Sequence, residues 1–504
     1  MRSRRRARAR AHPLHRPARG PPRRERLPTG GAPRERATVG RAVVFSSYEF
    51  FAFFLPAVLI AVALAGRRHT GRGQLVVLAL ASLLFYGWWR WSFLPLLLAS
   101  VGFNFVWARH ILRRGSPRAA RWTLAFGVSA NLFLLGWYKY RAFVAQNLNA
   151  VFGTHFDAVP VELPLTISFF TFQQIAYLVD THRDGRSESN PVRFAAFVSF
   201  FPQLIAGPIV RRDELIPQLG RRHRFTSAAL AEGLAIFTIG LFKKAVLADT
   251  LGPAVDPLFL EHSPVGFLDA WLACTGSMLQ IYFDFAGYSD MAVGLGVMLG
   301  IRLPDNFASP LKAVNINELW SRWHMTLTRF FRDYLYIPLG GNRVTRPRHI
   351  FNVMAMMLLI GVWHGASWAF VLVGLTQGVG VAIHALWTRT GIAIPSLLSR
   401  AITLVFFMST APAFRGSAPE HMESMWKAMV GFSDRPFGAG SRFSDADWVW
   451  ILGGLAIALL APNRQQIMKW PWRSDVAYVV VFGVALASGL LFVAGPVPFW
   501  YFQF

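Results

Sequence analysis

The segment 361–368, with the sequence GVWHGASW, places a histidine where a long apolar run ends. An ionisable side chain at membrane depth is costly, so it normally faces a cavity or the protein interior. Neutral imidazole accepts a proton near neutral pH, which suits a general base that activates a hydroxyl group. Gly361 and Gly365 leave room beside His364 for a substrate or for a neighbouring helix. His364 is therefore a candidate catalytic base, although a histidine that bonds a backbone carbonyl within a helix interface would give the same pattern.

A second histidine, His324, lies in the segment 318–342, which mixes tryptophans, arginines and apolar residues. Four apolar residues recur there at helical spacing and predict one helix that lies in or dips through the membrane interface: Trp320, Trp323, Leu327 and Phe331. His324 is next to this stripe and apart from the charged positions. The charged positions of this segment include Arg322, Arg329 and Arg332. These arginines could hold the phosphates of a nucleotide-type acyl donor, or they could meet lipid headgroups.

Two carboxylates, Asp284 and Asp290, lie in the apolar segment 280–291. Buried carboxylates need partners or a watery cavity. Because the two residues are six positions apart, they do not share one face of a regular helix. Paired acid–base chemistry is therefore disfavoured, and we expect each carboxylate to orient a histidine or to pair with an arginine.

Polar residues also interrupt the apolar segments 164–174, which contains Gln173, and 201–209. Hydroxyls, amides, prolines and glycines within such runs predict broken or re-entrant helices that line a cavity. Channels contain helices of this kind too, so the feature does not separate an enzyme from a channel.

The elements that must position these residues are apolar helices. Hydrophobic residues make up 54% of the 504 residues and charged residues 15%, and several apolar blocks approach or reach the roughly 20 residues that cross a bilayer. We predict an all-α, polytopic integral membrane protein with about eleven to thirteen membrane helices, re-entrant segments included. The single cysteine, Cys274, rules out an intrachain disulfide and a cysteine-based metal site. No metal is expected.

The formal net charge of +26 is unevenly distributed. Residues 1–42 hold fourteen arginines and two glutamates, a net +12, and leave +14 for the rest of the chain. This segment lacks the apolar core of a secretory signal. An arginine-rich arm could bind nucleic acid, but we favour a disordered tail or a start-site artefact, because a valine codon near residue 43 could start translation. Residues 43–504 would then form one domain, and no nucleic-acid partner is expected.

Basic residues crowd three connections, near residues 109–121, 211–224 and 343–348. Short cytoplasmic loops of membrane proteins carry an excess of lysine and arginine. All three connections are therefore predicted to lie on the cytoplasmic face.

From residue 43 onward the chain resembles the membrane-bound O-acyltransferase superfamily, in particular its branch with alginate O-acetyltransferase and the D-alanyl transferase of teichoic acids. The resemblance rests on the order of these segments: FSSYEFFAFFLP, PLTISFFTFQQIAYLVD, FPQLIAGPIVR, QIYFDFAGYSDMAVGLG, ELWSRWHMTLTRFFRDYLYIPLGGNR, GVWHGASW and FWYFQF. It implies a helical membrane fold around a funnel or tunnel. His364 matches the hallmark histidine of the superfamily, and His324 matches the second histidine of the polysaccharide-acetylating branch. The match loosens near 404–415, where Phe406-Phe407-Met408 replaces an aromatic–arginine signature and Arg415 could substitute.

The resemblance also implies a reaction. A cytoplasmic thioester, acetyl-CoA, would supply the acyl group, with no bound cofactor. His364 would activate the acceptor hydroxyl, and His324 would position that hydroxyl or stabilise the oxyanion. Candidate substrate contacts are Trp323, Trp363, Gln173, Asp284, Asp290, Arg322, Arg329 and Arg332. The implied surroundings are the bacterial cytoplasmic (inner) membrane with its lipid, an extracytoplasmic SGNH-type serine acetyltransferase as partner, and an extracellular or cell-wall polysaccharide as final acceptor.

Three alternatives remain open at this point. A D-alanyl transferase of the same fold would draw on a carrier-protein thioester. A polysaccharide transporter would also need many helices and a polar cavity, but no internal repeat of the transporter kind is evident. A non-catalytic scaffold would keep the fold without the reaction.

Overall fold

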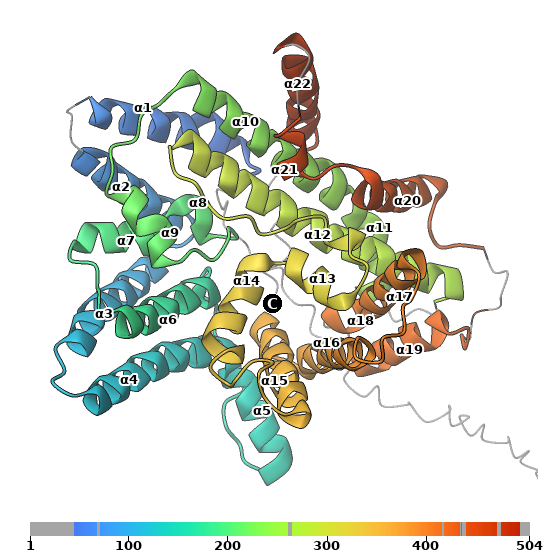
Figure 1. Cartoon of the computed structure of the whole chain (residues 1–504). Helices are drawn as coiled ribbons and strands as arrows, with labels where there is room; N and C mark the ends of the chain where they lie inside the picture. The colour runs from blue at the N-terminus through green and yellow to red at the C-terminus, as the bar shows by residue number, and fades with distance from the viewer. Residues whose placement is uncertain are drawn as a thin grey trace, which may run out of the picture. The chain divides into compact units, whose positions relative to one another are not determined.

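The computed structural model describes residues 45–67, 71–260, 265–415, 418–433, 435, 440–470 and 475–493. Within these residues every regular element is a helix (Figure 1). The all-α prediction is therefore confirmed. The predicted N-terminal tail, residues 1–42, lies outside the described residues, so its interpretation and the domain beginning at residue 43 stay predictions.

The helices follow one another along the chain. The first group comprises η1 (Phe50–Phe54), α1 (Leu55–Gly66), α2 (Gly71–Trp89), η2 (Trp91–Phe93), α3 (Leu94–Leu112), α4 (Pro117–Leu135), η3 (Gly136–Tyr140), α5 (Arg141–Phe152) and α6 (Ile167–Asp184). The middle group comprises α7 (Pro191–Ser199), α8 (Phe201–Leu204), α9 (Arg212–Leu219), α10 (Ser227–Leu241), η4 (Phe242–Ala248), α11 (Asp249–Leu260) and α12 (Phe267–Met298). The last group comprises η5 (Pro310–Lys312), α13 (Ile316–Arg322), α14 (Met325–Phe331), η6 (Arg332–Tyr336), α15 (Arg346–His364), α16 (Trp368–Trp387), α17 (Ser396–Ser409), α18 (Ala411–Phe414), α19 (Pro419–Met429), α20 (Asp445–Leu460), α21 (Arg464–Ile467) and α22 (Asp475–Leu491).

The helix α12 is the central element of the fold. It has 32 residues and is buried on nearly every side, as expected for a helix that is apolar all round. The helix α10 packs along it through facing glycines. A Cβ atom on Gly287 would lie 2.6 Å from the carbonyl oxygen of Gly240, and one on Gly294 would lie 2.6 Å from that of Gly233. Small residues at these positions therefore allow the two backbones to approach closely, as is common between membrane helices.

Four helical segments of the described chain are long and apolar enough to cross a membrane: Gly71–Trp89, Trp91–Leu112, Trp368–Trp387 and Ser396–Phe414. Two shorter apolar helical segments, Phe50–Gly66 and Asp475–Leu491, accompany them. Large apolar side chains such as Leu80, Phe133 and Ile383 are exposed on the outer faces of these and neighbouring helices, where lipid would cover them. The prediction of a polytopic membrane protein is confirmed, and the expected total of membrane helices stays a prediction.

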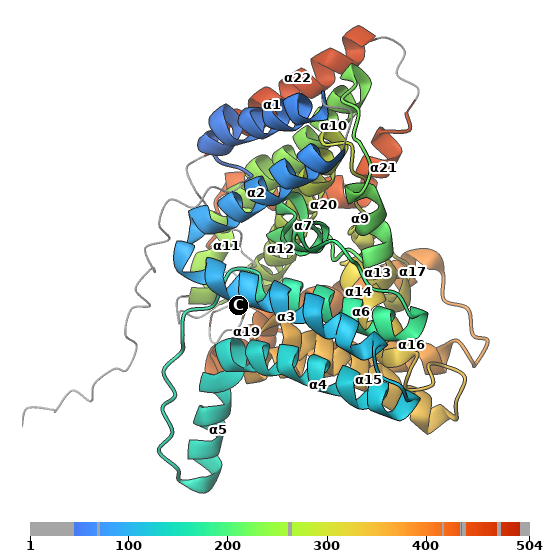
Figure 2. The same ribbon diagram turned by 90° about the vertical axis from the view of Figure 1, so that its left-hand side faces the viewer.

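The helix α5 turns away from its neighbours at a π-helical segment. Helix α4 runs into η3, whose wider turns change the direction of the chain. As a result α5 stands at a steep angle to α3 and α4 (Figure 2). The π-helical turn also sets the direction of Lys139 and Tyr140, which matters for the site below.

The prediction of one continuous helix through Trp320, Trp323, Leu327 and Phe331 is wrong. Helix α13 ends at Arg322, and α14 begins at Met325. Between them His324 has a left-handed backbone conformation, with φ of 41°. The apolar periodicity correctly predicted which side chains are buried. It could not predict the interruption of the helix, because hydrogen bonds with residues distant in the sequence hold that interruption in place.

Candidate active site

His364 is the last residue of α15, and its side chain is 4% exposed. The extended backbone of Gly365 ends the helix there, and the ring of Phe370 occupies the space where a side chain at position 365 would lie. The close packing of α15 on α16 depends on Gly361 and Gly374, since a Cβ atom on Gly361 would lie 2.7 Å from the Cα atom of Gly374. The segment 361–365 therefore places the histidine at a fixed point between helices.

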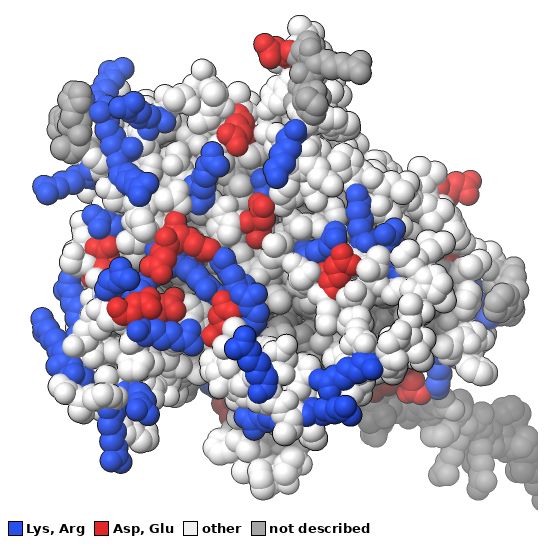
Figure 3. All heavy atoms as spheres, viewed as in Figure 1, with Lys and Arg blue, Asp and Glu red and all other residues white. Residues whose placement is uncertain are grey.

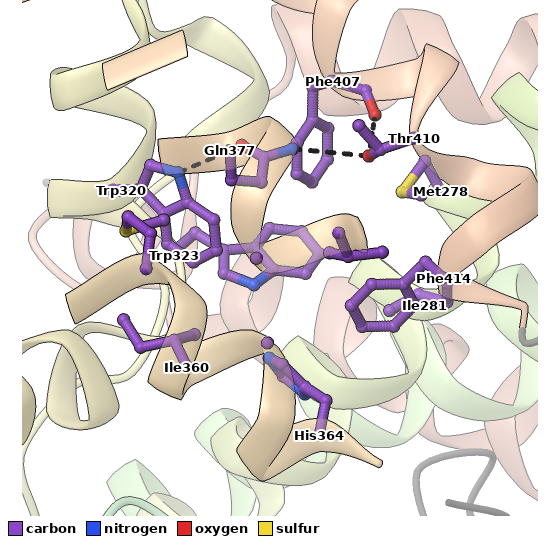
Figure 4. A pocket seen from close by; sticks show the side chains of 14 residues that line it. Met278, Ile281, Trp320, Trp323, Ile360, His364, Gln377, Phe407, Thr410 and Phe414 are labelled. Carbon is purple, nitrogen blue, oxygen red and sulfur yellow. Dashed lines mark hydrogen bonds between the residues drawn. The ribbon is translucent and has the colours of Figure 1, made fainter. Parts of the chain in front are cut away.

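His364 lines a small chamber between α12, α13, α15, α16 and α17 (Figure 4). The chamber has a volume of about 20 Å³, which is room for roughly one water molecule. Its apolar walls include Met278, Ile281, Trp323, Phe407 and Phe414. An imidazole beside such an apolar space can exchange a proton with a small reacting group that enters the chamber.

A hydrogen-bonded chain forms the polar wall of the chamber. The indole nitrogen of Trp320 donates to Oε1 of Gln377 at 3.2 Å, and Nε2 of Gln377 donates to the hydroxyl oxygen of Thr410 at 3.4 Å. In Figure 4 this chain lies across the chamber from His364. These hydrogen bonds fix the Trp320 ring, which lines both this chamber and a second cavity.

The second cavity is a larger vestibule of about 530 Å³. Its polar lining includes Asp305, Asn317, Ser321, Thr326, Thr328, Arg329 and Arg332. Trp320 and Met357 line both the vestibule and the chamber. These two side chains therefore belong to the walls of both cavities.

The three arginines predicted to contact substrate are each paired with a carboxylate. Arg329 binds both oxygens of Glu214, at 2.6 and 3.0 Å. Arg322 pairs with Glu318, and Arg332 donates to Asp333 at 2.7 Å. Of the three, Arg329 and Arg332 line the vestibule. An incoming phosphate would share these guanidinium groups with the carboxylates already present.

Further ion pairs surround the vestibule on the same face, where acidic and basic side chains gather over α6, α9 and α14 (Figure 3). Arg211 pairs with Asp333, and Arg212 pairs with Asp184. Partial burial raises the pKa of the Asp333 carboxyl, but hydrogen bonds from Arg332 and Arg211 outweigh that effect and leave the pKa below its usual value. Asp333 therefore stays ionised and helps to hold the arginines in place.

His324 is fully buried, at 0% exposure, and lies behind the wall of the chamber. The ring of Trp363 contacts both histidines, with centroid distances of 5.9 Å to His324 and 5.2 Å to His364. Phe285 packs edge-on against His324 at 4.6 Å. The structure thus brings together three residues predicted for the site, the two histidines and Trp363, and places Trp323 in the chamber wall.

Asp284 and Asp290 are each held in ion pairs within the fold. Asp290 accepts from Lys243 at 2.6 Å and from Arg464 at 2.8 Å, so the expected pairing with an arginine is present. Asp284 pairs with Lys244 at 2.7 Å. Neither aspartate lines the chamber or the vestibule.

The two ion pairs of Lys244 lead to a prediction for the stability of the protein. Lys244, 2% exposed on its side chain, bonds Asp249 at 2.6 Å as well as Asp284. Lys244→Met leaves two buried carboxylates without their shared cation, and we expect the protein in detergent to lose about 3–5 kcal/mol of stability. Thermal unfolding of purified protein measures the change. Lys427→Met, which removes an exposed ion pair with Glu423, is the control and should change little. Equal melting temperatures for the two variants would contradict the assignment.

Gln173 lies in a separate, small cavity of about 10 Å³ together with Gln203. Both side-chain amides donate to the carbonyl oxygen of Phe197, at 3.0 and 2.8 Å. The segment 201–209 contains only the short helix α8, as expected for a broken helix. The segment 164–174 instead leads into the continuous helix α6 (Ile167–Asp184), so a broken helix is wrong there, and the re-entrant alternative stays a prediction.

Several residues around the site were not singled out by the sequence patterns. Lys139 donates to the carbonyl oxygens of Trp363 at 2.6 Å and His364 at 3.1 Å. The hydroxyl of Tyr140 donates to the carbonyl oxygen of Val362 at 2.8 Å. A lysine inside an apolar run is itself a signal for a functional position in a membrane protein. The amide of Asn306, which bonds His324, carries no such signal.

Arg415 does not line the chamber, although its neighbour Phe414 does. Its guanidinium group donates to Ser277 and Asp256 at 2.7 Å each, and also to Gln280. Arg415 thus ties the end of α18 to α11 and α12.

The fold and the site define an integral membrane enzyme built from helices, with a buried histidine at a chamber next to a polar vestibule. The model of the MBOAT family, described as the membrane-bound O-acyltransferase family, matches residues 165–407, which include both histidines. The chain is 40% identical over 387 residues to the peptidoglycan O-acetyltransferase of Helicobacter pylori, covering 71% of this chain and 73% of that one. The chain belongs to the membrane-bound O-acyltransferase family.

Other relatives agree with this assignment. The chain is 42% identical over 349 residues to a protein named probable alginate O-acetylase AlgI from Azotobacter vinelandii, covering 68% of each chain. A teichoic acid D-alanyltransferase of Streptococcus thermophilus is 28% identical over 306 residues, covering 53% of this chain and 73% of that one. The predicted family and the predicted class of enzyme, an O-acyltransferase, are confirmed. The named O-acetyl-transferring relatives are closer to the chain than the D-alanyl-transferring one.

Proposed function

We propose that the protein transfers an acetyl group from a cytoplasmic thioester, acetyl-CoA, for the O-acetylation of an extracellular or cell-wall polysaccharide. One observation carries the proposal: His364 lies at a chamber that shares Trp320 and Met357 with an arginine-lined vestibule. A thioester that enters the vestibule would lie against two side chains that also line the chamber of His364. The names of the relatives at 40% and 42% identity support acetyl as the group transferred.

The arginine-rich face is proposed to be cytoplasmic, in the cytoplasmic (inner) membrane of a bacterium. The connections after α3 and α9 and before α15, which carry the basic clusters, lie on one side of the helices (Figure 2). That is the side expected for the cytoplasm. The vestibule contains Arg329 and Arg332 and belongs to the face with the ion pairs of Arg211 and Arg212. Acetyl-CoA would therefore reach it from the compartment in which the donor is made.

The chemistry follows from the position of His364. Its imidazole accepts the proton of the acceptor hydroxyl as the hydroxyl oxygen attacks the thioester carbonyl carbon. The tetrahedral oxyanion then collapses, the carbon–sulfur bond breaks, and the thiolate takes the proton from the imidazolium. His324 either positions the acceptor hydroxyl or stabilises the oxyanion. No bound cofactor is required for this sequence.

The immediate acceptor is proposed to be the serine of an extracytoplasmic SGNH-type acetyltransferase, which passes the acetyl group to the polysaccharide. The chamber's volume of about 20 Å³ favours a small reacting group over a sugar unit. A single hydroxymethyl group is a better match for a site of this size than a polymer. Direct transfer to a glycan hydroxyl is the second possibility.

The experiment compares a strain that lacks the gene with the same strain carrying the wild-type gene. Ester-linked acetate on isolated surface polysaccharide should fall to background in the first and return in the second. Ester-linked D-alanine is measured in the same hydrolysate, and its loss in place of acetate would indicate a D-alanyl transferase. Loss of the polysaccharide itself would indicate a transporter, and no change in any of the three would contradict the proposed reaction.

A further inference from the structure

The amide of Asn306 connects His324 to the neighbouring helices. Asn306 is 2% exposed and lies in the segment between α12 and η5. Its Oδ1 atom faces Nδ1 of His324 at 3.1 Å and also faces Thr326, with the hydroxyl at 2.9 Å and the backbone nitrogen at 3.3 Å. Its Nδ2 atom donates to the hydroxyl oxygen of Ser289 at 3.2 Å.

These contacts determine which atom of the amide faces the histidine. A backbone N–H group can only donate, so the atom of Asn306 that faces the backbone nitrogen of Thr326 must be the oxygen. The hydroxyl oxygen of Thr326 accepts from the backbone N–H group of Ile209 at 3.0 Å. The hydroxyl proton of Thr326 is therefore donated to Oδ1 of Asn306. Nδ1 of His324 therefore meets an acceptor and must carry the proton of the neutral ring. The lone pair of the ring is then on Nε2.

The backbone holds this arrangement from both sides. The N–H group of Met325 donates to the carbonyl oxygen of Asn306 at 2.9 Å, and that of Ala308 donates to the carbonyl oxygen of Arg322 at 3.0 Å. These bonds bracket His324, whose φ of 41° is unfavourable for a residue with a side chain. Such strain persists where the surrounding structure over-determines it, and it is concentrated at functional sites.

The other ring nitrogen, Nε2, is buried and has no hydrogen-bond partner in the described residues. The surroundings of the ring are aromatic, with Phe285 at 4.6 Å and Trp363 at 5.9 Å between centroids. A buried acceptor without a partner is costly unless a ligand supplies the donor. A hydroxyl group is a ligand that could do so.

We propose that Asn306 is a positioning residue that fixes the neutral His324 with its proton on Nδ1, so that Nε2 is left to accept a hydrogen bond from an N–H or O–H group of a bound substrate. The proposal rests on the acyl transfer proposed above and excludes the oxyanion role left open there. In this tautomer His324 has no proton on Nε2 to give to an oxyanion. The reacting hydroxyl has a single proton, which goes to His364. The group that donates to Nε2 of His324 is therefore a different N–H or O–H group of the substrate, and His324 positions the substrate through it.

The tautomer can be measured without any activity. Solid-state NMR of protein with ¹⁵N-labelled histidine, in lipid vesicles, distinguishes a protonated from a bare ring nitrogen, and the spectrum of His324→Gln identifies the His324 signals. The wild-type protein should show protonated Nδ1 and bare Nε2, and Asn306→Leu should lose this preference. A protonated Nε2 in the wild-type protein would overturn the proposal.

Acetate transfer in the complemented strain then tests the role of Asn306. Asn306→Leu should lower transfer by about 10²-fold, since a wrong tautomer disables an imidazole, whereas Asn306→Asp, which keeps an oxygen facing Nδ1, should retain more of it. Asn352→Leu is the matched control, because Asn352 is a fully buried amide that bonds only the carbonyls of Leu339 and Gly341. The proposal predicts that Asn306→Leu has no added effect in a His324→Gln protein.

A further loss in that double variant would show that Asn306 acts independently of His324 and would overturn the positioning role. Failure of the proposed function looks different: the wild-type protein would transfer no acetate while the NMR tautomer remained as described.

Discussion

His364→Gln is expected to lower ester-linked acetate on surface polysaccharide by about 10²–10⁴-fold, the usual contribution of a general base. Glutamine keeps most of the side-chain volume at the wall of the chamber but cannot take up a proton from a hydroxyl. The loss should therefore come from the reaction and not from folding. The measurement is acetate released by mild base from polysaccharide of the complemented strain, normalised to the amount of the variant in membranes.

The matched control is His384→Gln, on the neighbouring helix α16. His384 is partly exposed and lines neither the chamber nor the vestibule. It should leave acetate at the wild-type level. Full acetate with His364→Gln at normal abundance would refute the assignment of His364 and would favour a scaffold or a conduit.

Lys139→Met is expected to have the next largest effect, a fall in acetate transfer of about 10²-fold, because small displacements of a reacting group have effects of that size. The last carbonyl groups of a helix have no partner within it, and at the end of α15 Lys139 supplies donors to those of Trp363 and His364. A cation there also interacts favourably with the helix dipole. Without the ammonium group of Lys139, the backbone carbonyl of His364 loses its hydrogen bond to η3.

Two further variants separate positioning from general damage. Lys139→Arg keeps a charged donor and should recover part of the activity, whereas Tyr140→Phe removes only the bond to the carbonyl of Val362 and should have a smaller effect. Melting temperatures in detergent accompany each assay. If Lys139→Met lost activity only in proportion to its abundance, Lys139 would hold the fold together without positioning His364.

The sequence by itself determined the class of the protein and predicted His364 as the candidate catalytic residue. Long apolar blocks with few charges require helices in a membrane, because only a helix satisfies its own backbone there without pairing to another strand. Within such a block His364 was recognisable, since an ionisable side chain between two glycines is expensive to place in lipid. The pairing of Asp290 with an arginine followed from the same reasoning.

Tertiary structure alone decided how the site is supported. The apolar stripe from Trp320 to Phe331 fits a continuous helix locally. The helix is nevertheless interrupted at His324, because hydrogen bonds with residues 306–308 hold the backbone on both sides of the interruption. Lys139 is far from His364 along the chain and still bonds its carbonyl group. Sequence periodicity reports which face of a helix is buried, but it does not report which distant side chain will meet that face. The partners of the two histidines are set by packing between separate helices, so they appear only in the folded molecule.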